Sequence, residues 1–226
     1  RDPFDWLVDV LGPREEATVA PFAGGALGYF AYDLGRRVEQ LPGRASEAAW
    51  PEMAVGLYDW ALITDHVTRR AWVVSAGRDP RGPSWRRYLD LLDAAPALAA
   101  PVPPRGIGPV RSNLSRADYD RAFARLQRYI LDGDCYQANF AQKFTARVRG
   151  DPWQAYRVLR AVSPAPFAAY LDYPFGQVLS ASPESFLDLE GRVVTTQPIK
   201  GTRPRGDSLG ADEALATELR LSAKDR

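Results

Sequence analysis

The sequence predicts a mixed, sheet-rich α/β fold. Hydrophobic residues make up 46% of the 226 positions and aromatic residues 11%, which is enough to fill a core. The 19 prolines and 18 glycines divide the chain into many short elements, unlike a helical bundle. Segments with the period of a strand and segments with the spacing of a helix both occur, so helices and strands are both expected.

The N-terminal part of the chain is predicted to be rich in strands. Residues 23–33 (AGGALGYFAYD) read as a strand interrupted by glycines. Residues 53–66 and 71–77 read as two strands joined by a turn at 65–70. In these segments apolar residues either alternate with polar ones or form continuous runs, and both patterns are typical of strands in a sheet.

A helix and a proline-rich connector are expected next. In residues 84–95 the apolar side chains, from Trp85 to Leu92, recur on one helical face. Residues 96–113 contain repeated prolines, which have no N–H to donate and cannot continue a helix. The sequence therefore predicts a connector without regular structure near 96–113.

The C-terminal part mixes both kinds of element. A helix is predicted from the capping residue Ser115 to Gly133, with apolar residues at intervals of three and four. Residues 134–148 alternate between apolar and polar side chains and are predicted to form a strand. A second helix is expected over residues 152–162, after a capping aspartate, and a strand over residues 167–173.

A hairpin is predicted to bring a carboxyl group and a lysine to the same end of a sheet. Residues 184–197 (ESFLDLEGRVVTTQ) read as two strands joined at 190–191, where the glycine allows the positive φ of a tight turn. This register places Glu184 opposite Gln197. Lys200 follows three residues later, roughly 10 Å along the chain. Glu184 and Lys200 should therefore lie near each other.

The local sequence around Lys200 indicates a chemical role. Pro198 ends strand pairing, and Gly201 allows another group to approach the backbone closely. A lysine that is partly removed from water becomes a usable amine nucleophile, and a neighbouring carboxyl group can supply or accept its proton. Most lysines are solvated loop residues, so the residue pattern alone supports an amine–carboxyl site without naming its substrate.

Composition excludes several classes of function. The chain has 29 basic and 28 acidic residues and no basic stripe, so nucleic acid is not an expected partner. Cys135 is the single cysteine and His66 the single histidine, which leaves no zinc cluster and no intrachain disulfide. No apolar run approaches the ~20 residues that span a bilayer. A protein of the cytoplasm without a membrane partner is expected.

Six segments carry a resemblance to a known family: 21–37, 53–66, 133–144, 180–186, 197–205 and 222–226. In this order they resemble motifs of the chorismate-utilising enzymes, in particular component I of aminodeoxychorismate synthesis in the folate pathway. The resemblance implies an α/β fold of the α+β type, with large, mainly antiparallel sheets packed with helices. It also implies that residues 1–226 are an incomplete portion of the enzyme domain.

The resemblance assigns roles to particular residues. It implies that the Lys200 amine attacks C2 of chorismate and expels the C4 hydroxyl, after which ammonia adds at C4 and displaces the lysine. Glu184 would be the general acid/base. Gly201 and Thr202 would line the substrate pocket. Gln137 stands where water-adding relatives have a lysine base, so it would line the cleft without moving a proton.

The resemblance also implies a cofactor and a partner protein. Mg²⁺ is the expected cofactor, with its ligands beyond the C-terminal end of this chain and no metal ligand within it. An N-terminal segment and the C-terminal metal-binding part are expected to be missing, so the 226-residue chain alone should be inactive. Ammonia is expected from a glutamine amidotransferase subunit, because Cys135 has no catalytic histidine at a plausible spacing.

Two alternatives stay open. Anthranilate synthase component I has alanine where this chain has Lys200, and its ammonia attacks the ring directly. The second alternative is a non-catalytic or regulatory module that binds tryptophan. Residues 163–170 resemble one side of a tryptophan pocket, with Pro166 and Phe167 as the expected contacts, although two ordinary core residues would fit the same pattern.

Overall fold

We describe the fold from a computed structural model, which covers residues 2–13, 20–40, 50–77, 84–97 and 99–223. The chain divides into two compact units. Each contains helices and strands, so the mixed fold predicted from the sequence is confirmed. The first unit contains residues 1–99, 173–176 and 187–196, and the second contains residues 100–172, 177–186 and 197–226.

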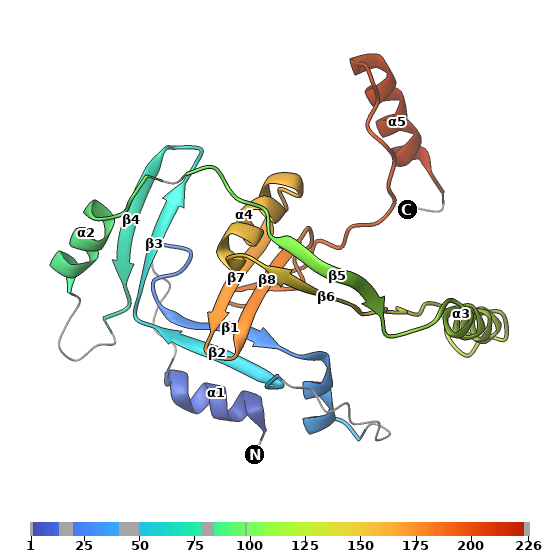
Figure 1. The fold of residues 1–226 in the computed structure, drawn as a ribbon, viewed down its shortest axis with the longest axis horizontal. Coiled ribbons are helices and arrows are strands. Elements are labelled where there is room, and N and C mark those ends of the chain that lie inside the picture. The colour runs from blue at the N-terminus through green and yellow to red at the C-terminus, as the bar shows by residue number, and fades with distance from the viewer. Residues whose placement is uncertain (1, 14–19, 41–49, 78–83, 98, 224–226) are drawn as a thin grey trace. The chain divides into compact units, whose positions relative to one another are not determined.

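The strands of the first unit form antiparallel pairs. β1 (Gly25–Phe30) pairs with β2 (Met53–Tyr58), and β3 (Trp60–Asp65) pairs with β4 (Arg70–Ser75) (Figure 1). The predicted turn between β3 and β4 is confirmed, because Asp65 and Arg70 are direct partners across it. The large sheets that the resemblance implied are represented, among the described residues, by two-stranded sheets.

The prediction of one continuous strand over residues 53–66 was wrong. Asp59 separates β2 from β3, and the two strands then pair with different partners. The Asp59 side chain accepts a hydrogen bond from the Ser75 hydroxyl at 3.2 Å, and its carbonyl accepts one from the Ala76 N–H at 3.0 Å. These two hydrogen bonds hold Asp59, between β2 and β3, against the C-terminal end of β4.

The described residues of the first unit contain three helical segments: α1 (Pro3–Leu11), the 3₁₀ helix η1 (Tyr32–Arg37) and α2 (Trp85–Asp93). The sequence analysis did not predict α1, although Asp2 caps it by accepting the Phe4 N–H at 2.7 Å. The predicted helix at α2 is confirmed. Its Tyr88 ring stacks on Trp60 with the ring centroids 4.2 Å apart.

A short hairpin joins β9 (Asp188–Glu190) to β10 (Val193–Thr195), so the predicted hairpin is present. Its predicted register was wrong by two residues. Glu190 pairs with Val193, which makes Gly191 the first residue of the turn, and Gly191 has a φ of 60°. Hairpin turns with two central residues favour glycine at this position. Counted outward, this register places position 184 opposite position 199 rather than 197.

In the second unit, β5 (Arg105–Ser112) pairs with β6 (Phe144–Arg149). The prediction that proline excludes regular structure throughout 96–113 was therefore wrong. The register shifts between Ile107 and Arg111, and this irregularity accommodates Pro109 within β5. The predicted strand over 134–148 is also shorter than expected, since residues 136–143 have no regular structure and only β6 forms a ladder.

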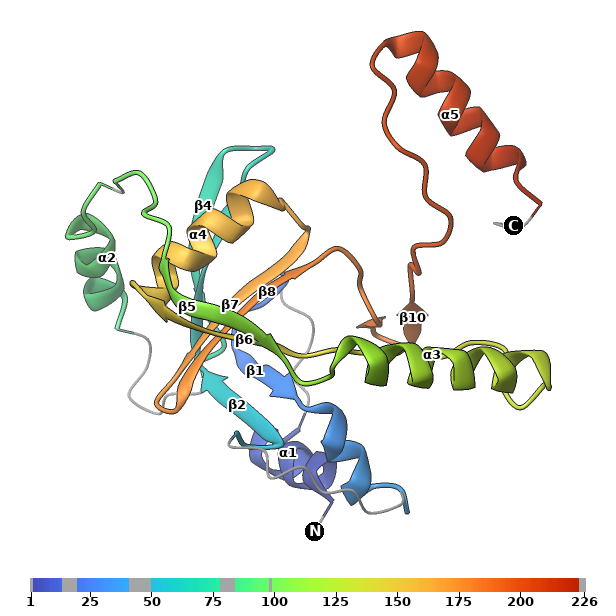
Figure 2. The same cartoon turned by 45° about the vertical axis from the view of Figure 1, so that its right-hand side comes forward.

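The two predicted helices of the second unit are confirmed. α3 (Arg116–Leu131; Figure 2) begins at Ser115. The Ser115 hydroxyl accepts the Asp118 N–H at 3.1 Å. α4 (Pro152–Val162) begins at Asp151, whose carboxylate accepts the Trp153 N–H at 3.0 Å. Both caps satisfy a backbone donor that a helix N-terminus otherwise leaves unpaired.

The remaining elements are β7 (Phe167–Tyr173), β8 (Gly176–Ser182) and α5 (Leu209–Leu221). β7 and β8 pair, and Tyr170 of β7 packs against Trp153 and Tyr156 of α4 with ring centroids 5.2 and 5.5 Å apart. Tyr156 is only 6% exposed and contacts the rings of both Trp153 and Tyr170. β8 leads directly to Glu184, and the connection after β10 leads to α5 (Figure 2).

The apolar content predicted to fill a core is only partly buried. Ala23, Leu34 and Tyr156 are buried, whereas Tyr136 is 93% exposed and Phe186 is 85% exposed. Many other large apolar side chains of the described residues are also exposed. Exposed apolar surface of this extent is typical of surfaces that contact another protein segment.

Candidate active site

The structure places Glu184 beside the backbone of the residue that precedes Lys200. The Ile199 N–H donates a hydrogen bond to the Glu184 carboxylate, across 15 positions of the chain. Glu184 and Lys200 are therefore near each other in the structure, because the Glu184 carboxylate binds the backbone of the residue directly before Lys200. The route differs from the prediction, because the corrected hairpin register brings Ile199 rather than Gln197 opposite Glu184.

A turn at the end of β8 presents Glu184. The Ser182 hydroxyl donates a hydrogen bond to the Glu184 carbonyl at 3.1 Å and lies 3.4 Å from the Glu184 N–H, which donates to it. Pro183, between them, cannot continue the strand ladder. The chain therefore leaves β8 in a fixed direction and places the Glu184 side chain toward the segment that contains Lys200.

Lys200 lies in a segment without helix or strand. Its side chain is exposed, as is that of Glu184, so the burial expected for a nucleophilic lysine is not present in this chain. Gly201, directly after the lysine, has a φ of 55°, a conformation that side chains rarely adopt. The sequence has only two other lysines, Lys143 and Lys224, and most of its basic residues are arginines.

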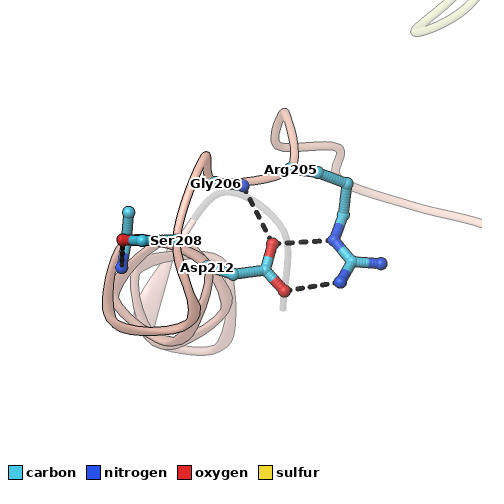
Figure 3. A network of polar contacts seen from close by, with 5 residues as sticks. Arg205, Gly206, Ser208 and Asp212 are labelled. Atoms are coloured by element: carbon cyan, nitrogen blue, oxygen red, sulfur yellow. Dashed lines mark hydrogen bonds and ion pairs between the residues drawn. The ribbon is translucent and has the colours of Figure 1, made fainter.

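The segment after Lys200 is attached to α5 by two ion pairs. Arg205 binds Asp212 through two hydrogen bonds of 2.7 and 2.6 Å, and the Gly206 N–H donates to the same carboxylate at 2.9 Å (Figure 3). Arg203 binds Glu218 at 2.8 Å. The sequence analysis did not identify these pairs, although basic residues followed by the capping residue Ser208 and acidic positions in the next helix are a usable signal.

Electrostatics agree with this geometry. The hydrogen bond from Arg205, followed by the one from the Gly206 N–H, holds the pKa of Asp212 below its usual value. The same contact with Asp212 raises the pKa of Arg205. Both groups therefore carry their charges throughout the neutral range, and the pair is a bidentate one that fixes orientation as well as distance.

Two other residues assigned by resemblance, Gln137 and Thr202, take no part in the hydrogen bond between Ile199 and Glu184. Gln137 is exposed in the irregular stretch before β6, and the contacts of the described residues do not join it to Glu184 or Lys200. Thr202 is exposed, and its carbonyl accepts a hydrogen bond from Arg203 at 3.0 Å. Gln137 and Thr202 therefore remain predicted pocket residues.

The predicted tryptophan contacts are at the start of β7. Pro166 is exposed, and Phe167, the first residue of β7, is 48% exposed. Tyr170, three positions further along β7 and therefore on the opposite face of the strand, belongs to the aromatic cluster with α4, and burial raises its pKa. Whether Pro166 and Phe167 bind tryptophan remains a prediction.

Neither a metal cluster nor a membrane span is found in the described part of the chain. No group of three or more His, Cys, Asp or Glu side chains among the described residues is placed to hold a metal ion. These residues therefore do not by themselves fit Mg²⁺. No helix of the described residues is long and apolar enough to cross a membrane.

Comparisons with known proteins identify the class. The family of chorismate binding enzymes matches residues 2–226, so the chain belongs to this family. Aminodeoxychorismate synthase component 1 of Klebsiella aerogenes is 46% identical over 207 residues, which are 91% of this chain and 44% of that protein. The Salmonella typhimurium protein of the same name is 44% identical over the same shares.

Anthranilate synthase components are also similar. The Thermus thermophilus component 1 is 36% identical over 234 aligned residues, covering 100% of this chain and 50% of that protein. The crystal structure of anthranilate synthase component I from Streptococcus pneumoniae has a TM-score of 0.82 at 24% identity and covers 100% of this chain and 51% of that one. This likeness confirms the fold. The chain spans about half the length or less of these relatives.

Proposed function

We propose that this chain is part of component I of an aminodeoxychorismate synthase, which converts chorismate and ammonia to 4-amino-4-deoxychorismate in folate biosynthesis. The hydrogen bond from the Ile199 N–H to Glu184 carries the proposal, because it places an acid beside the lysine of the Pro-Ile-Lys-Gly-Thr motif. The similarity to proteins of that name, at 46% and 44% identity, supports the same function.

The proposed chemistry uses Lys200 as the nucleophile. Its neutral amine forms a bond to C2 of chorismate, the ring double bonds shift, and the C4 hydroxyl leaves as water after Glu184 donates a proton to it. Ammonia then forms a bond to C4, and the bond from C2 to the lysine amine breaks. The net reaction consumes chorismate and ammonia and releases 4-amino-4-deoxychorismate and water, with Lys200 regenerated.

We place Gly201, Thr202 and Gln137 around the substrate. Gly201 leaves room for close approach beside the nucleophile because it has no side chain. Gln137 carries an amide, which is not a base, so water addition to chorismate is disfavoured. In this proposal Mg²⁺ is bound by residues outside the described part of the chain, and it would neutralise the carboxylates of chorismate.

Further protein is proposed to complete the site. The described residues leave large apolar side chains exposed, and the relatives are about twice as long as the matched region. A longer polypeptide would cover that surface, exclude water from Glu184 and Lys200, and supply the metal ligands. We propose that ammonia comes from a separate or fused glutamine amidotransferase and that the protein acts in the cytoplasm.

The alternative function with a specific observation in its favour is anthranilate synthase component I. The Thermus thermophilus anthranilate synthase component matches the whole chain at 36% identity. Residue 200 separates the two functions, because a lysine there provides the amine that the proposed covalent route needs. A tryptophan-binding module with Pro166 and Phe167 in its pocket remains the non-catalytic alternative.

Product identification tests the proposal. The full-length protein is incubated with chorismate, ammonium and Mg²⁺, and products are separated by liquid chromatography and identified by mass spectrometry. We expect 4-amino-4-deoxychorismate from the unsubstituted protein and none from Lys200→Ala. Lys200→Arg should also be inactive, because a guanidinium stays protonated and cannot attack. Arg192→Ala, in the exposed β9–β10 turn, is the control and should keep the product.

Each other outcome has a clear meaning. Anthranilate from the unsubstituted protein and from Lys200→Ala would assign the protein to the anthranilate synthases and make the lysine incidental. Tight binding of tryptophan without conversion of chorismate would favour the regulatory module. Turnover of chorismate by a verified 25.0 kDa species would contradict the expectation that these 226 residues alone are inactive.

A further inference from the structure

The segment that carries Lys200 is fixed at two points. Before the lysine, the Ile199 N–H is bound to the Glu184 carboxylate. After it, Arg205 and Gly206 are bound to Asp212, in the first turn of α5 (Figure 3). Lys200 therefore lies in a short stretch of irregular backbone between two attached positions. Its location depends on how firmly both positions are held.

We propose that Asp212 is a positioning residue for Lys200: by binding Arg205 and the Gly206 N–H, it holds residues 200–206 in place against α5. This inference rests on the proposed function, in which Lys200 is the nucleophile. Asp212 does not touch the substrate in this proposal. It acts through the backbone that connects Arg205 to Lys200.

The Asp212 carboxylate uses both of its oxygens. Oδ1 accepts hydrogen bonds from Arg205 Nε at 2.7 Å and from the Gly206 N–H at 2.9 Å, and Oδ2 accepts one from Arg205 Nη2 at 2.6 Å. The Asp212 side chain is 28% exposed, so water competes less for its carboxylate than it would for a fully exposed one. A bidentate contact and a backbone contact to one carboxylate together restrict both the distance and the direction of the segment.

Asp212 is itself held firmly by its helix. The Ser208 hydroxyl caps α5 by accepting the Ala211 N–H at 3.3 Å, and a carboxylate in the first turn is favoured by the helix dipole. The backbone of Gly206 lies directly against this turn. A Cβ at position 206 would come within 2.3 Å of the Asp212 nitrogen and 2.6 Å of the Ala211 carbonyl carbon.

A second ion pair supports the same segment. Arg203 Nε lies 2.8 Å from Glu218 Oε1, and Arg203 Nη1 donates to the Thr202 carbonyl at 3.0 Å. Glu218 is on the same helix as Asp212, further toward its C-terminus. Two attachments to one helix oppose rotation of the segment as well as translation, so residues 200–206 and α5 should move as one body.

This arrangement matters for the attack on chorismate. A nucleophile must meet its target atom within a narrow range of distance and angle, and a displacement of about 1 Å can slow a reaction about 100-fold. Loss of the Asp212 charge should therefore slow bond formation by the Lys200 amine. It should change the affinity for chorismate less, because Gln137 and the proposed Mg²⁺ site, which also bind the substrate in this proposal, lie outside this segment.

The test measures Lys200 adduct formation directly. Full-length protein is mixed with chorismate and Mg²⁺ without ammonia, and the mass of the lysine adduct is followed over a single turnover. Asp212→Asn keeps an oxygen to accept the Gly206 N–H but removes the charge that faces Arg205. We expect adduct formation to slow at least about 10-fold with the KM for chorismate changed less than about twofold, a split that marks loss of an interaction needed for the chemical step.

Arg205→Gln is a second variant, which removes the other partner of the ion pair between Arg205 and Asp212. Because both substitutions remove the same contact, the double variant should be no slower than the slower single variant. Should Asp212→Asn fail to fold, Arg205→Gln decides the question by the same measurement. The matched control is Asp120→Asn on α3, which removes the 2.9 Å ion pair of Asp120 with Arg116 and should leave the adduct rate unchanged.

Hydrogen exchange of the Gly206 amide gives a readout that does not depend on activity. Faster exchange is expected in Asp212→Ala, which removes the acceptor of the Gly206 N–H, and not in Asp120→Ala. An adduct rate in Asp212→Asn equal to that of the unsubstituted protein overturns the inference. Absence of any Lys200 adduct from the unsubstituted protein contradicts the proposed function instead, and unchanged Gly206 exchange would then also show that Asp212 does not hold the segment.

Discussion

The backbone N–H of Ile199 donates a hydrogen bond to the side-chain carboxylate of Glu184, 15 positions earlier in the chain. Lys200 follows Ile199 directly, so this contact brings an acid to the residue next to the proposed nucleophile. The contact uses one carboxylate oxygen. The other oxygen remains available, in the proposed reaction, to give a proton to the leaving hydroxyl of chorismate.

The first prediction concerns the two functions of Glu184. Glu184→Ala removes both the acid and the acceptor of the Ile199 N–H, and kcat should fall by about 100-fold to 10,000-fold. Glu184→Gln retains an oxygen acceptor but has no acidic proton, so it should lose as much activity while keeping the slow exchange of the Ile199 amide. Steady-state kinetics of the full-length protein, with hydrogen exchange, separate the two. Full activity in Glu184→Gln would exclude acid catalysis by this residue.

A second prediction concerns the contact of Gly206 with α5. Gly206→Ala places a methyl group within 2.3 Å of backbone at Asp212, so the segment or the helix must move. We expect slower product formation and faster exchange of the Gly206 amide, because the added methyl group separates Gly206 from its acceptor Asp212. Gly210→Ala is the matched control, since a Cβ at Gly210 meets no heavy atom within 4 Å. An equal loss of product formation in Gly206→Ala and Gly210→Ala would show that displacement of the segment does not cause the effect.

A third prediction concerns charge on the β5–β6 pair. Arg105 and Arg149 are direct cross-strand partners, and like charges in this relation destabilise a sheet. Arg149→Glu should therefore raise the free energy of unfolding by about 0.2 to 1 kcal/mol. Arg147→Glu, opposite Ile107, is the control and should give a smaller change. Chemical denaturation at low and high salt measures both, and the gain should shrink as salt increases.

A fourth prediction concerns pH and the β3–β4 turn. The Asp65 carboxylate accepts the Thr68 hydroxyl at 2.6 Å and also the backbone N–H groups of Thr68 and Val67, and these bonds lower the pKa of Asp65. A carboxyl whose folded pKa is below its unfolded pKa stabilises the fold above the unfolded value and loses that contribution as the pH falls through the folded value.

Thr68→Ala tests this directly. It removes the hydroxyl donor, so it should destabilise the protein at pH 6 and the loss should become smaller as the pH falls below about 4. Thr145→Ala, in β6, is the control and should show a difference that does not depend on pH. A Thr68→Ala effect of constant size from pH 6 to pH 2 would show that the hydroxyl does not stabilise the ionised Asp65.

A fifth prediction concerns Gly191, at the first position of the β9–β10 turn. Its φ of 60° is costly for a residue with a Cβ, so Gly191→Ala should destabilise the protein by about 1 kcal/mol. Gly191→Asn should cost less, because asparagine adopts this conformation more readily. Thermal or chemical unfolding measures the difference. Equal stability of all three proteins would show that the turn does not constrain the hairpin.

Local chemistry explains which elements were predictable. Ser115 and Asp151 are capping residues followed by apolar side chains at helical spacing, and the structure has helices that begin at both. Both signals are contained within one helical turn, so they depend little on the rest of the chain. The strand predicted before Lys143 failed for the opposite reason. Alternation of side chains favours a strand, but a strand also needs a partner, and β5 pairs only from position 144 onward, with Asn113 and Lys143 as the last contact.

The candidate site was only partly predictable. The motif around Lys200 and the presence of a hairpin indicated that Glu184 and the lysine lie together. The hydrogen bond from the Ile199 N–H to the Glu184 carboxylate agrees with this, because Ile199 directly precedes Lys200. The ion pairs of Arg205 with Asp212 and of Arg203 with Glu218 were not predicted. Each joins side chains across a loop and a helix, and their pairing depends on how that loop folds back.

By itself the sequence determined the mixed fold, the starts of α2, α3 and α4, the hairpin and the lysine with its neighbouring glycine, because turn residues, caps and apolar spacing act over a few positions. The tertiary structure alone decided the hairpin register, which places Glu184 opposite Ile199, and the attachment of residues 200–206 to α5. Register and attachment are set by backbone geometry at Gly191 and by contacts between distant residues, and a slip of two residues preserves the same alternation of side chains. The pattern of residues is therefore equally consistent with both registers.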